Sequence, residues 1–485
     1  MTTLPRDLVE AANRCLVLGF DGTALPDELK RLTDAGLGGV ILHTRNVSGQ
    51  AQLRELTDEL RSLRPGLLIT VDQEGGGISH LARAGAPETP GNWALGVADD
   101  TELTAAVADA LARHLAACGV TVSFAPVADV HRVAANPIVR TRAFGADPVH
   151  AARHVTAWIE ATLAAGVAPC AKHFPGHGST TVDSHLGVAV DARDEQVLRE
   201  TDLLPFRAAI TAGAPILMTA HVVYPALDPD APATLSRRIL TDLLRTELGF
   251  QGVVVTDALE MKAIADGVGE AAGAVAAIAA GADQLIVARP DPGLWLRCRD
   301  ALLDAMADGR LDPGRVIESA RRVDALAERF AQPPSPSAEF GPAEDMGLRA
   351  ARQAIRWKPL PGPVIDPFVV DLHRRPKPAL EWARTDLVGI LCEVMPGTDG
   401  IAATQGPVEV TDILRRAQGR PLLIATEDPD LHPWQAAVRT ALLTGRPDAL
   451  LIATGLPDAE TEAADGLCVY GRGRANLRAV AEALL

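Results

Sequence analysis

The sequence of 485 residues lacks a surplus of basic residues, a long apolar run and any paired cysteine motif. Its formal net charge is −16, whereas a protein that binds nucleic acid or an anionic membrane normally needs a basic face. We therefore expect neither a nucleic-acid partner nor a membrane partner. No run of about 20 apolar residues indicates a membrane span. The first residues show no basic region followed by an apolar one, so we expect no secretory signal.

The six cysteines stand singly, without a CxxC pair or another spacing typical of metal ligands. Scattered single cysteines are typical of reduced thiols, which favours a cytoplasmic protein. Hydrophobic residues make up 47% and charged residues 22% of the chain, an ordinary globular composition. The length allows more than one domain.

Eight short apolar runs recur before residue 290, separated by stretches rich in Ala, Leu and Arg. The runs are 15–20, 39–43, 67–71, 122–127, 168–173, 215–220, 252–256 and 284–288. Because they are continuous rather than alternating, they predict parallel strands buried on both faces. Alternating strands and helices predict βαβ units. Eight such units favour a (β/α)8 barrel of the TIM type, with a doubly wound open sheet as the alternative.

Polar residues follow each of these runs at once, whereas the starts of the runs carry no comparable groups. In chain order they are Asp21; Arg45 and Asn46; Asp72, Gln73 and Glu74; Asp129; Lys172 and His173; His221; Asp257; and Arg289. In a barrel of this type the carboxyl ends of the strands form the active face. The pattern therefore predicts that binding and catalytic groups gather at that end.

The second part of the chain follows a segment rich in proline, serine and acidic residues. A helical pattern over 316–332 closes the first region, and 333–345 has the composition of a linker. Beyond it, strand-like runs at 367–372, 387–394, 421–428, 449–454 and 466–471 predict a smaller α/β domain with an open, mostly parallel sheet. We thus expect a barrel domain over 1–332, a linker over 333–345 and a second domain over 346–485.

The segment KHFPGHGSTTVDSH (172–185) combines histidines, glycines and hydroxyls in a way that suits neither a core helix nor a core strand. His173 and His177 have the spacing of metal ligands on a helix, but Pro175 and Gly176 disfavour a helix. GHGST has the composition of a phosphate-binding loop without the order of residues that a P-loop needs. A loop without a function is a further alternative.

Acid/base catalysis is the interpretation that this segment favours most. Asp183 and His185 are two residues apart, and residues i and i+2 of an extended segment project on the same side. A carboxylate so placed can orient an imidazole, which titrates near neutrality. Such a pair needs a nucleophile or an activated water.

Asp257, in the stretch VVVTDALEM, is the candidate for that nucleophile. A carboxylate at the end of an apolar strand is costly to desolvate unless it has partners, and a nucleophilic or electrostatic role would justify that cost. The alternative is that Asp257 caps a helix over ALEMKAI. Position alone leaves both open.

Several long motifs resemble, in the correct order, those of glycoside hydrolase family 3 in its β-N-acetylglucosaminidase branch. They are TVDQEGG (70–76), FAPVADV (124–130), NPIVRTRAFG (136–145), KHFPGHGSTTVDSH (172–185), MTAHVVYPALD (218–228) and GFQGVVVTDALEM (249–261). The resemblance spans roughly residues 10–335. It implies a TIM-like barrel that hydrolyses β-glycosides with retention, through a covalent glycosyl-enzyme.

The resemblance also implies roles for individual residues. Asp257 matches the nucleophile, His185 the acid/base and Asp183 its partner. The residues that match sugar-binding positions are Asp72, Arg142, Lys172 and His173, although Lys172 by itself also suits a structural ion pair. No metal and no organic cofactor is implied.

One departure concerns the sugar-binding subsite. His80 stands where the family usually has an arginine, four residues after the double glycine of VDQEGG. That arginine contributes to sugar binding, so we keep His80 as a candidate substrate-binding residue, with an imidazole in place of the guanidinium. Arg83, three residues further on, is the nearest candidate to replace it.

The sequence thus predicts a retaining exo-β-N-acetylglucosaminidase of the cytoplasm. It would release terminal N-acetylglucosamine from cell-wall fragments, as in peptidoglycan recycling, or from small chito-oligosaccharides. A phosphorylase is the first alternative, because a histidine that has given up its proton is neutral and does not repel an incoming phosphate. A sugar-binding or sensor protein is the second, and His80 is its only support. The expected partner is a small carbohydrate. The sequence does not determine the oligomeric state, and a monomer is favoured.

Overall fold

Eight parallel strands close into a barrel in the computed structural model, which describes residues 4–184, 187–330, 343–357, 364–375, 385–405, 408–463 and 466–485. The strands are β1 (Leu16–Gly19), β2 (Gly39–Leu42), β3 (Leu68–Val71), β6 (Val122–Ser123), β7 (Ala168–Phe174), β9 (Ile216–Thr219), β12 (Val253–Ala258) and β13 (Gln284–Val287). They follow one another around the barrel in chain order. Each of the eight apolar runs overlaps a barrel strand, and closure of the sheet excludes the open-sheet alternative.

Side chains of each strand alternate between two hydrophobic cores, which is why the runs are apolar throughout. Val17 lies in the cluster that fills the barrel, whereas Leu16 and Leu18 pack in the cluster between the strands and the surrounding helices. Helix α12 (Pro313–Phe330) contributes Leu326 and Phe330 to the inner cluster. It therefore plugs the barrel from one end.

That plugged end is the amino end of the strands. Asp283 directly precedes β13, is fully buried, and accepts a hydrogen bond at 2.8 Å from Arg315 and one at 3.2 Å from Arg322, both on α12. Arg245 also donates to Asp283. With the amino end closed by these contacts, the carboxyl end is the one that opens to ligands.

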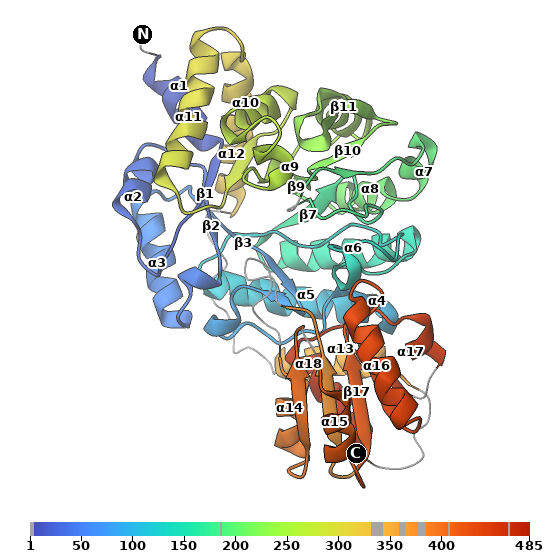
Figure 1. Ribbon diagram of the computed structural model, residues 1–485. Coiled ribbons are helices and arrows are strands. Elements are labelled where there is room, and N and C mark those ends of the chain that lie inside the picture. Colours follow the sequence, from blue (N-terminus) through green and yellow to red (C-terminus); the bar gives the residue numbers. More distant parts are fainter. Residues whose placement is uncertain are drawn as a thin grey trace.

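Helices surround the barrel on all sides (Figure 1). They are α1 (Arg6–Arg14), α2 (Asp27–Asp34), α3 (Gln50–Leu63), α4 (Asn92–Ala98), α5 (Thr101–Ala117), α6 (Pro148–Ala164), α7 (Glu195–Glu200), α8 (Leu203–Thr211), the π-helix η5 (Arg238–Glu247), α9 (Lys262–Ala265), α10 (Glu270–Ala280) and α11 (Pro292–Ala307). Short 3-10 turns are η1 (Thr44–Asn46), η2 (Ala82–Ala84), η3 (Arg140–Arg142) and η4 (Ala233–Leu235). Two small sheets complete the region: β4 (Gln73–Gly75) with β5 (Ile78–Ser79), and β8 (Ala189–Val190) with β10 (Val222–Tyr224) and β11 (Asp228–Pro232).

Several helix starts follow from local sequence signals. Asp147 caps α6 by accepting from the backbone N–H of His150, and Pro148 occupies the first helical position. Asp291 and Pro292 begin α11 in the same way. A side-chain oxygen before the helix satisfies an orphan N–H, and proline costs nothing where no N–H bond is made.

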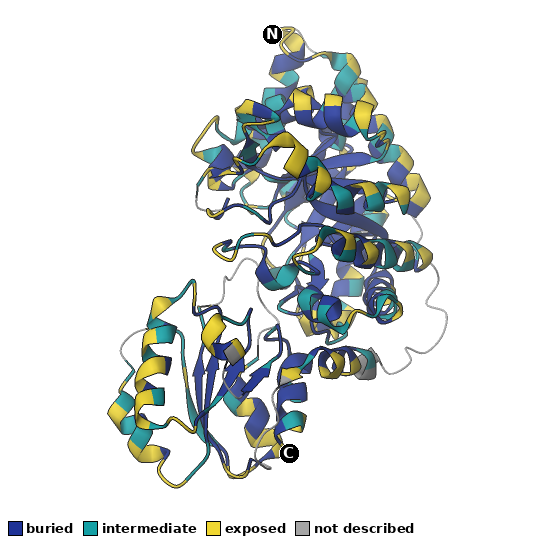
Figure 2. Cartoon of the chain, turned by 90° about the vertical axis from the view of Figure 1, so that its right-hand side faces the viewer, coloured by how far each residue is buried: buried dark blue, intermediate teal, exposed yellow. Residues whose placement is uncertain are grey.

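The second domain is a six-stranded sheet with helices on both faces (Figure 2). Its strands are β14 (Arg356–Trp357), β15 (Phe368–Leu372), β16 (Asp399–Ala403), β17 (Leu422–Thr426), β18 (Leu450–Ala453) and β19 (Gly466–Cys468), in the order β14-β19-β18-β17-β15-β16. Only β14 runs antiparallel to its neighbour. Its helices are α13 (Ala343–Ala354), α14 (Leu387–Val394), α15 (Val410–Arg416), α16 (Pro433–Gly445), α17 (Ala459–Ala463) and α18 (Arg474–Leu484). The expected open, mostly parallel sheet is confirmed.

One predicted strand of this domain is wrong, because residues 387–394 form helix α14. Asp386 caps the helix and accepts hydrogen bonds from the backbone N–H groups of Val388 and Gly389, at 3.1 and 3.2 Å. Leu387, Ile390 and Leu391 are buried at helical spacing. A short apolar run fits a buried strand and a buried helix equally well, and here the cap decides.

Most of the predicted linker lies outside the described residues, since 331–342 are not described. Residues 343–345, which the linker prediction included, already belong to α13. That helix packs against α4 and α5 of the barrel as well as α18 of the second domain. The bounds given above for the two domains stay a prediction.

Polar contacts join the second domain to the barrel. Arg140, in η3, pairs with Asp428 at 3.0 Å and with Asp430 at 3.1 Å. Asn476 donates to the backbone oxygen of Pro90 at 3.1 Å. Arg140 and Asp428 both have positive φ, 38° and 55°, a region that L-residues rarely adopt. The strained backbone on both sides of this ion pair is thus held by the contact between domains.

No described helix combines the length and the apolarity that crossing a bilayer requires. The six cysteines are free thiols, as expected from their spacing.

Candidate active site

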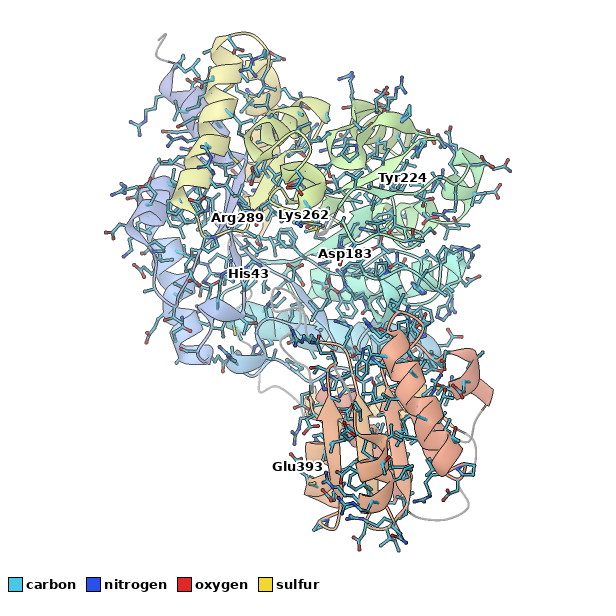
Figure 3. The ribbon with its side chains drawn as sticks, in the orientation of Figure 1. His43, Asp183, Tyr224, Lys262, Arg289 and Glu393 are labelled. Atoms are coloured by element: carbon cyan, nitrogen blue, oxygen red, sulfur yellow. The ribbon has the colours of Figure 1, made fainter. Side chains whose placement is uncertain are left out.

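A cavity of about 360 Å³ opens at the carboxyl end of the barrel. Its wall includes His43 after β2, Asp72 after β3, Lys172 and His173 at the end of β7, Met218 in β9, Asp257 in β12 and Arg289 after β13. Figure 3 shows where His43, Arg289 and Asp183 lie in the barrel domain. The expected gathering of polar groups at this end is confirmed for most strands.

Not every polar residue that follows a strand reaches the cavity. Asp21 is exposed, with 74% of its side chain accessible, and does not line it. Asn46 donates to the backbone oxygens of Phe20 and Gly22. Gln73 bonds within the β4–β5 hairpin, and His221 is held by Thr234 and the backbone oxygen of Ala258. These side chains stabilise the ends of the strands.

Lys172 is buried between two carboxylates. Its ammonium lies 2.5 Å from Asp72 Oδ1 and 2.7 Å from Glu74 Oε1. Burial by itself would lower the pKa of Lys172, but the two carboxylates raise it above its ordinary value. Lys172 is therefore both a structural ion-pair partner and a charged group in the cavity wall.

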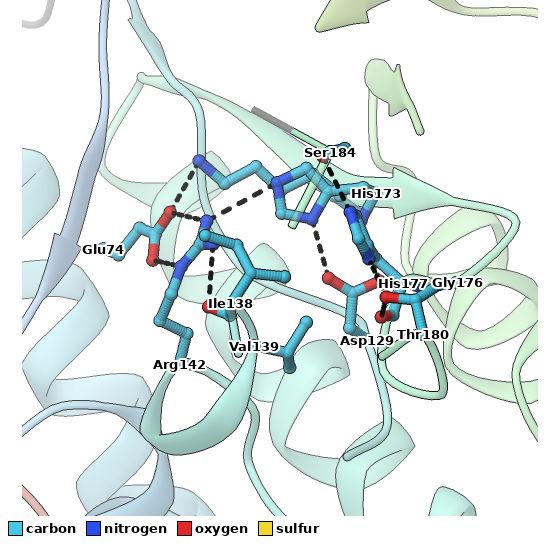
Figure 4. Close-up of polar contacts among 12 residues, drawn as sticks. Glu74, Asp129, Ile138, Val139, Arg142, His173, Gly176, His177, Thr180 and Ser184 are labelled. Carbon is cyan, nitrogen blue, oxygen red and sulfur yellow. Dashed lines mark hydrogen bonds and ion pairs between the residues drawn. The ribbon is translucent and has the colours of Figure 1, made fainter. Parts of the chain in front are cut away.

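Glu74 extends this ion pair into a longer chain of contacts (Figure 4). Arg142 binds Glu74 with two parallel hydrogen bonds of 2.9 and 2.8 Å, and its Nη2 lies 3.5 Å from His173 Nε2. Burial would raise the pKa of Glu74, yet Arg142 and Lys172 hold it well below its usual range. Glu74 is thus ionised, and it fixes both cations at the cavity.

Asp129 lies at the other end of this series of contacts. Its Oδ2 lies 2.6 Å from His173 Nδ1, and its Oδ1 accepts from the backbone N–H groups of His173 and His177 at 3.1 and 2.7 Å. The carboxylate therefore orients the His173 ring and also holds the start of the glycine-rich loop. Sequence reasoning noted Asp129 and Glu74 after their strands but gave neither a role in the site.

His177 is a loop-shaping residue in this structure. Its Nδ1 lies 2.8 Å from Thr180 Oγ1 and its Nε2 lies 2.9 Å from Ser184 Oγ. Burial, followed by the proximity of His173, lowers the pKa of His177 to about 4. Both ring nitrogens of His177 thus have protein partners. His177 therefore has no free nitrogen with which to bind the metal ion that was considered for His173 and His177.

Asp257 lies in β12 rather than at the start of a helix. The next helix, α9, begins at Lys262 after Met261, so the helix-cap interpretation is wrong. The backbone N–H of Ala258 donates to Asp257 Oδ1 at 2.8 Å, and the side chain lines the cavity. This contact helps to hold the Asp257 carboxylate in the cavity wall.

Glu260 also lines the cavity, three residues after Asp257, and sequence reasoning missed it. Burial raises the pKa of its carboxyl to about 6. Glutamate on a short turn after a strand gives no sequence signal that separates it from a surface residue.

The predicted acid/base pair is described only in part. Asp183 is buried and faces a second cavity, whereas His185 lies outside the described residues. Ser184, between them, lines the first cavity and contacts His177. Asp183 and Ser184 thus line different cavities, although they are adjacent in the chain.

His80 lies beside the cavity rather than in its wall. It is fully buried, and its Nδ1 lies 3.1 Å from Thr44 Oγ1. Burial lowers the pKa of His80 to about 4, so the ring is neutral at pH 7. Arg83 is exposed and does not line the cavity either.

A second cavity, of about 530 Å³, lies between the barrel and the second domain. It shares Glu74, Ile138 and Arg142 with the first cavity. The second domain contributes Arg374, Glu427, Asp428, Leu431, His432, Thr454, Gly455, Tyr470, Gly471 and Arg472 to its wall. No sequence signal identified these residues, because they come from loops far from the barrel motifs in the chain.

Comparison with known proteins decides the family. A family model described as the N-terminal domain of glycosyl hydrolase family 3 matches residues 19–326. The chain belongs to this family. Family 3 membership makes the protein a glycoside hydrolase, which acts on O-glycosyl bonds, and agrees with the motifs, the barrel and the separate smaller domain.

Individual relatives narrow the resemblance within family 3. The chain is 43% identical over 278 residues to a beta-hexosaminidase of Pseudomonas aeruginosa, a match that covers 56% of this chain and 81% of that one. It is 35% identical over 337 residues to beta-hexosaminidase A of Pseudoalteromonas piscicida, covering 64% of this chain but only 56% of that protein's length. Among solved structures, a family 3 beta-N-acetylglucosaminidase from Paenibacillus sp. str. FPU-7 aligns over 99% of this chain and 97% of that one, with a TM-score of 0.89 and 31% identity.

The buried ion pairs of Glu74 predict that Glu74→Gln lowers both stability and activity. The change leaves Lys172 and Arg142 with one counter-charge fewer, and breaking a buried ion pair costs about 3–5 kcal/mol. We expect the free energy of unfolding to fall by about that amount, and kcat/KM on a hexosaminide to fall because both cations lose their fixed position. Urea titration and steady-state kinetics measure the two effects. Glu55→Gln, the same change at an exposed site on α3, should alter neither; an equal response of the two variants would contradict the role given to Glu74.

Proposed function

We propose that the protein is a retaining exo-β-N-acetylglucosaminidase that releases terminal N-acetylglucosamine from cell-wall fragments or small chito-oligosaccharides. Action in the cytoplasm and a place in peptidoglycan recycling belong to the same proposal. The observation that carries it is the position of Asp257, in the wall of the same cavity as Asp72 and Lys172. The activities named for the similar proteins support an N-acetylated sugar as the substrate.

Charged groups of the cavity suit the hydroxyls of a terminal sugar. A hydroxyl both donates and accepts, so it can bond to the Asp72 carboxylate and to the Lys172 ammonium, which already lie 2.5 Å apart. Arg142 and His173 supply further donors on the same side. Hydrogen bonds with an ionised partner are roughly twice as strong as neutral ones, and the ion pairs hold these groups in place before the sugar arrives.

Asp257 is assigned as the nucleophile. Its carboxylate attacks the anomeric carbon while the bond to the glycosidic oxygen breaks, and that oxygen takes a proton from His185, which Asp183 orients. A covalent glycosyl ester on Asp257 results. His185, now neutral, removes a proton from water as the water attacks the anomeric carbon. The ester bond breaks, which frees the Asp257 carboxylate and releases the sugar with its original anomeric configuration.

The rest of the substrate is assigned to the cavity between the domains. The two cavities meet at Glu74, Ile138 and Arg142, and Asp183 faces the larger one. A terminal sugar in the smaller cavity would therefore direct its glycosidic bond towards the loop that carries His185. The second domain would then contact the leaving group through polar residues of that cavity, such as Arg374 and His432.

The nucleophile assignment predicts loss of turnover in Asp257→Gly. We expect kcat on nitrophenyl β-N-acetylglucosaminide to fall by several orders of magnitude, because no carboxylate can form the ester. Added azide should restore turnover and give an α-glycosyl azide, since the small anion attacks from the vacated face. Asp21→Gly, a carboxylate change at the end of β1 outside the cavity, should retain activity. A β-configured product or activity close to that of the original protein would contradict the assignment.

The acid/base assignment predicts a dependence on the leaving group. His185→Ala should slow hydrolysis strongly for substrates with poor leaving groups and little for nitrophenyl or dinitrophenyl glycosides, because a nitrophenolate hardly needs a proton. Rates across a series of aryl glycosides measure this slope. Equal losses on good and poor leaving groups would show that His185 acts elsewhere.

One assay tests the whole proposal against its alternatives. Turnover of nitrophenyl β-N-acetylglucosaminide is followed with and without millimolar phosphate, and the sugar product is identified. We expect free N-acetylglucosamine at a rate that phosphate does not change. N-acetylglucosamine 1-phosphate with a large rate increase would instead establish a phosphorylase. Binding of the sugar without turnover in either buffer would establish a sugar-binding or sensor protein.

A further inference from the structure

Three residues with metal-binding side chains lie together at the edge of the cavity: His43, Asp72 and His80. One ligand atom from each lies within 4.8 Å of the others. The rings of His43 and His80 are 5.1 Å apart between centroids and nearly perpendicular, at 73°. His43 and Asp72 line the cavity, and His80 is fully buried beside it.

The sheet brings these residues together from distant points in the chain. Leu42 pairs with Val71 in the parallel ladder of β2 and β3, so the next residues, His43 and Asp72, lie side by side. The hairpin of β4 and β5 pairs Gln73 with Ser79, which returns His80 to the level of Asp72. Three ligands are thus supplied by three adjacent strand ends.

Two ring nitrogens in this cluster are buried without a hydrogen-bond partner among the described residues. They are His43 Nδ1 and His80 Nε2. Buried polar atoms of native proteins nearly always have a partner, so an orphan pair in one cluster points to a bound species.

The contacts of Thr44 hold the ring of His80 at its Nδ1 side. Thr44 Oγ1 donates to the backbone oxygen of His80 at 3.3 Å and lies 3.1 Å from its Nδ1. The backbone N–H of Thr44 also donates to Nδ1, at 3.4 Å, so both contacts of the ring are made at Nδ1, and Nε2 has no partner among the described residues.

The geometry and donor set suit a zinc-like ion. A tetrahedral ion with bonds of ~2.1 Å holds its ligand atoms ~3.4 Å apart, so the ligands need to close by ~1.4 Å at most. Two imidazoles and a carboxylate are ligands that Zn²⁺ accepts readily, whereas Mg²⁺ and Ca²⁺ prefer oxygens. Asp72 Oδ1 already serves Lys172, but a carboxylate has two oxygens and can serve an ammonium and a metal together.

We propose that His43, Asp72 and His80 form a Zn²⁺ site, and that zinc there inhibits the enzyme by withdrawing Asp72 from the sugar. The inhibition is competitive, because zinc and the sugar claim the same carboxylate at the wall of the same cavity. The effect on turnover rests on the proposed function, whereas the binding of zinc does not.

Direct binding tests the site without reference to activity. Chelator-treated protein is titrated with Zn²⁺ by calorimetry, and with Co²⁺ by absorption, where a four-coordinate ion gives intense visible bands. Loss of even an outer-shell partner costs metal sites ~10–100-fold in affinity, so His80→Gln and His43→Phe should each weaken Zn²⁺ binding at least ~100-fold. Unfolding temperatures establish that each variant is folded, and either variant alone is sufficient for the test.

The chain offers a matched control in a second cluster, Asp99, His150 and His154. There Arg153 already donates to Asp99 at 2.7 Å and lies 3.2 Å from His150 Nδ1, so a cation occupies the ligands. The double variant His150→Gln/His154→Gln should bind Zn²⁺ as the original protein does. No zinc binding, or binding that only the second pair weakens, would overturn the proposal.

Kinetics then test the inhibitory effect. In the original protein Zn²⁺ should raise the apparent KM for nitrophenyl β-N-acetylglucosaminide without changing kcat, and the effect should be much smaller in His43→Phe. Zinc that binds but lowers KM would contradict the inhibitory role, because it would mean that the ion itself holds the sugar. If no variant or buffer gives turnover, the proposed function fails while the binding data still decide the site.

Discussion

The buried ammonium of Lys172, held between Asp72 and Glu74, is the interaction on which the rest of the site depends. A cation in that position is tolerated only because two carboxylates compensate its lost hydration. Glu74 in turn fixes Arg142, which reaches His173. The same chain ends at Asp129, whose bonds to the backbone hold the start of the glycine-rich loop. One line of charges thus fixes both the wall of the cavity and the start of the loop.

The architecture explains why this line of charges lies at an open end. Helix α12 fills the amino end of the barrel, where its Arg315 and Arg322 donate hydrogen bonds to the buried carboxylate of Asp283. The second domain covers one side of the other end and is joined to it by Arg140. This arrangement leaves a small charged cavity inside the barrel and a larger one between the domains. The two cavities meet at Glu74 and Arg142. Such an arrangement suits a ligand whose end is recognised separately from its remainder.

Local patterns predicted the barrel and the position of Asp257, because strands buried on both faces are apolar throughout and must end where polar groups begin. Patterns failed where a single capping residue or a contact between distant segments decides. The apolar pattern of residues 387–394 fits a strand, but these residues form a helix that Asp386 caps. His80 follows the double glycine as a sugar-binding residue would, but the β4–β5 hairpin turns it beside the cavity and towards His43. The cavity residues of the second domain carry no motif, since only the docking of the two domains brings them to the site.

Trapping of the covalent intermediate tests the central claim most directly. The protein is incubated with a fluorinated N-acetylglucosaminyl fluoride, which forms the ester quickly and releases it slowly, and is then digested and analysed by mass spectrometry. The account predicts one added sugar on the peptide that contains Asp257. Turnover of this donor without any adduct, or an adduct on another carboxylate such as Glu260, would contradict it.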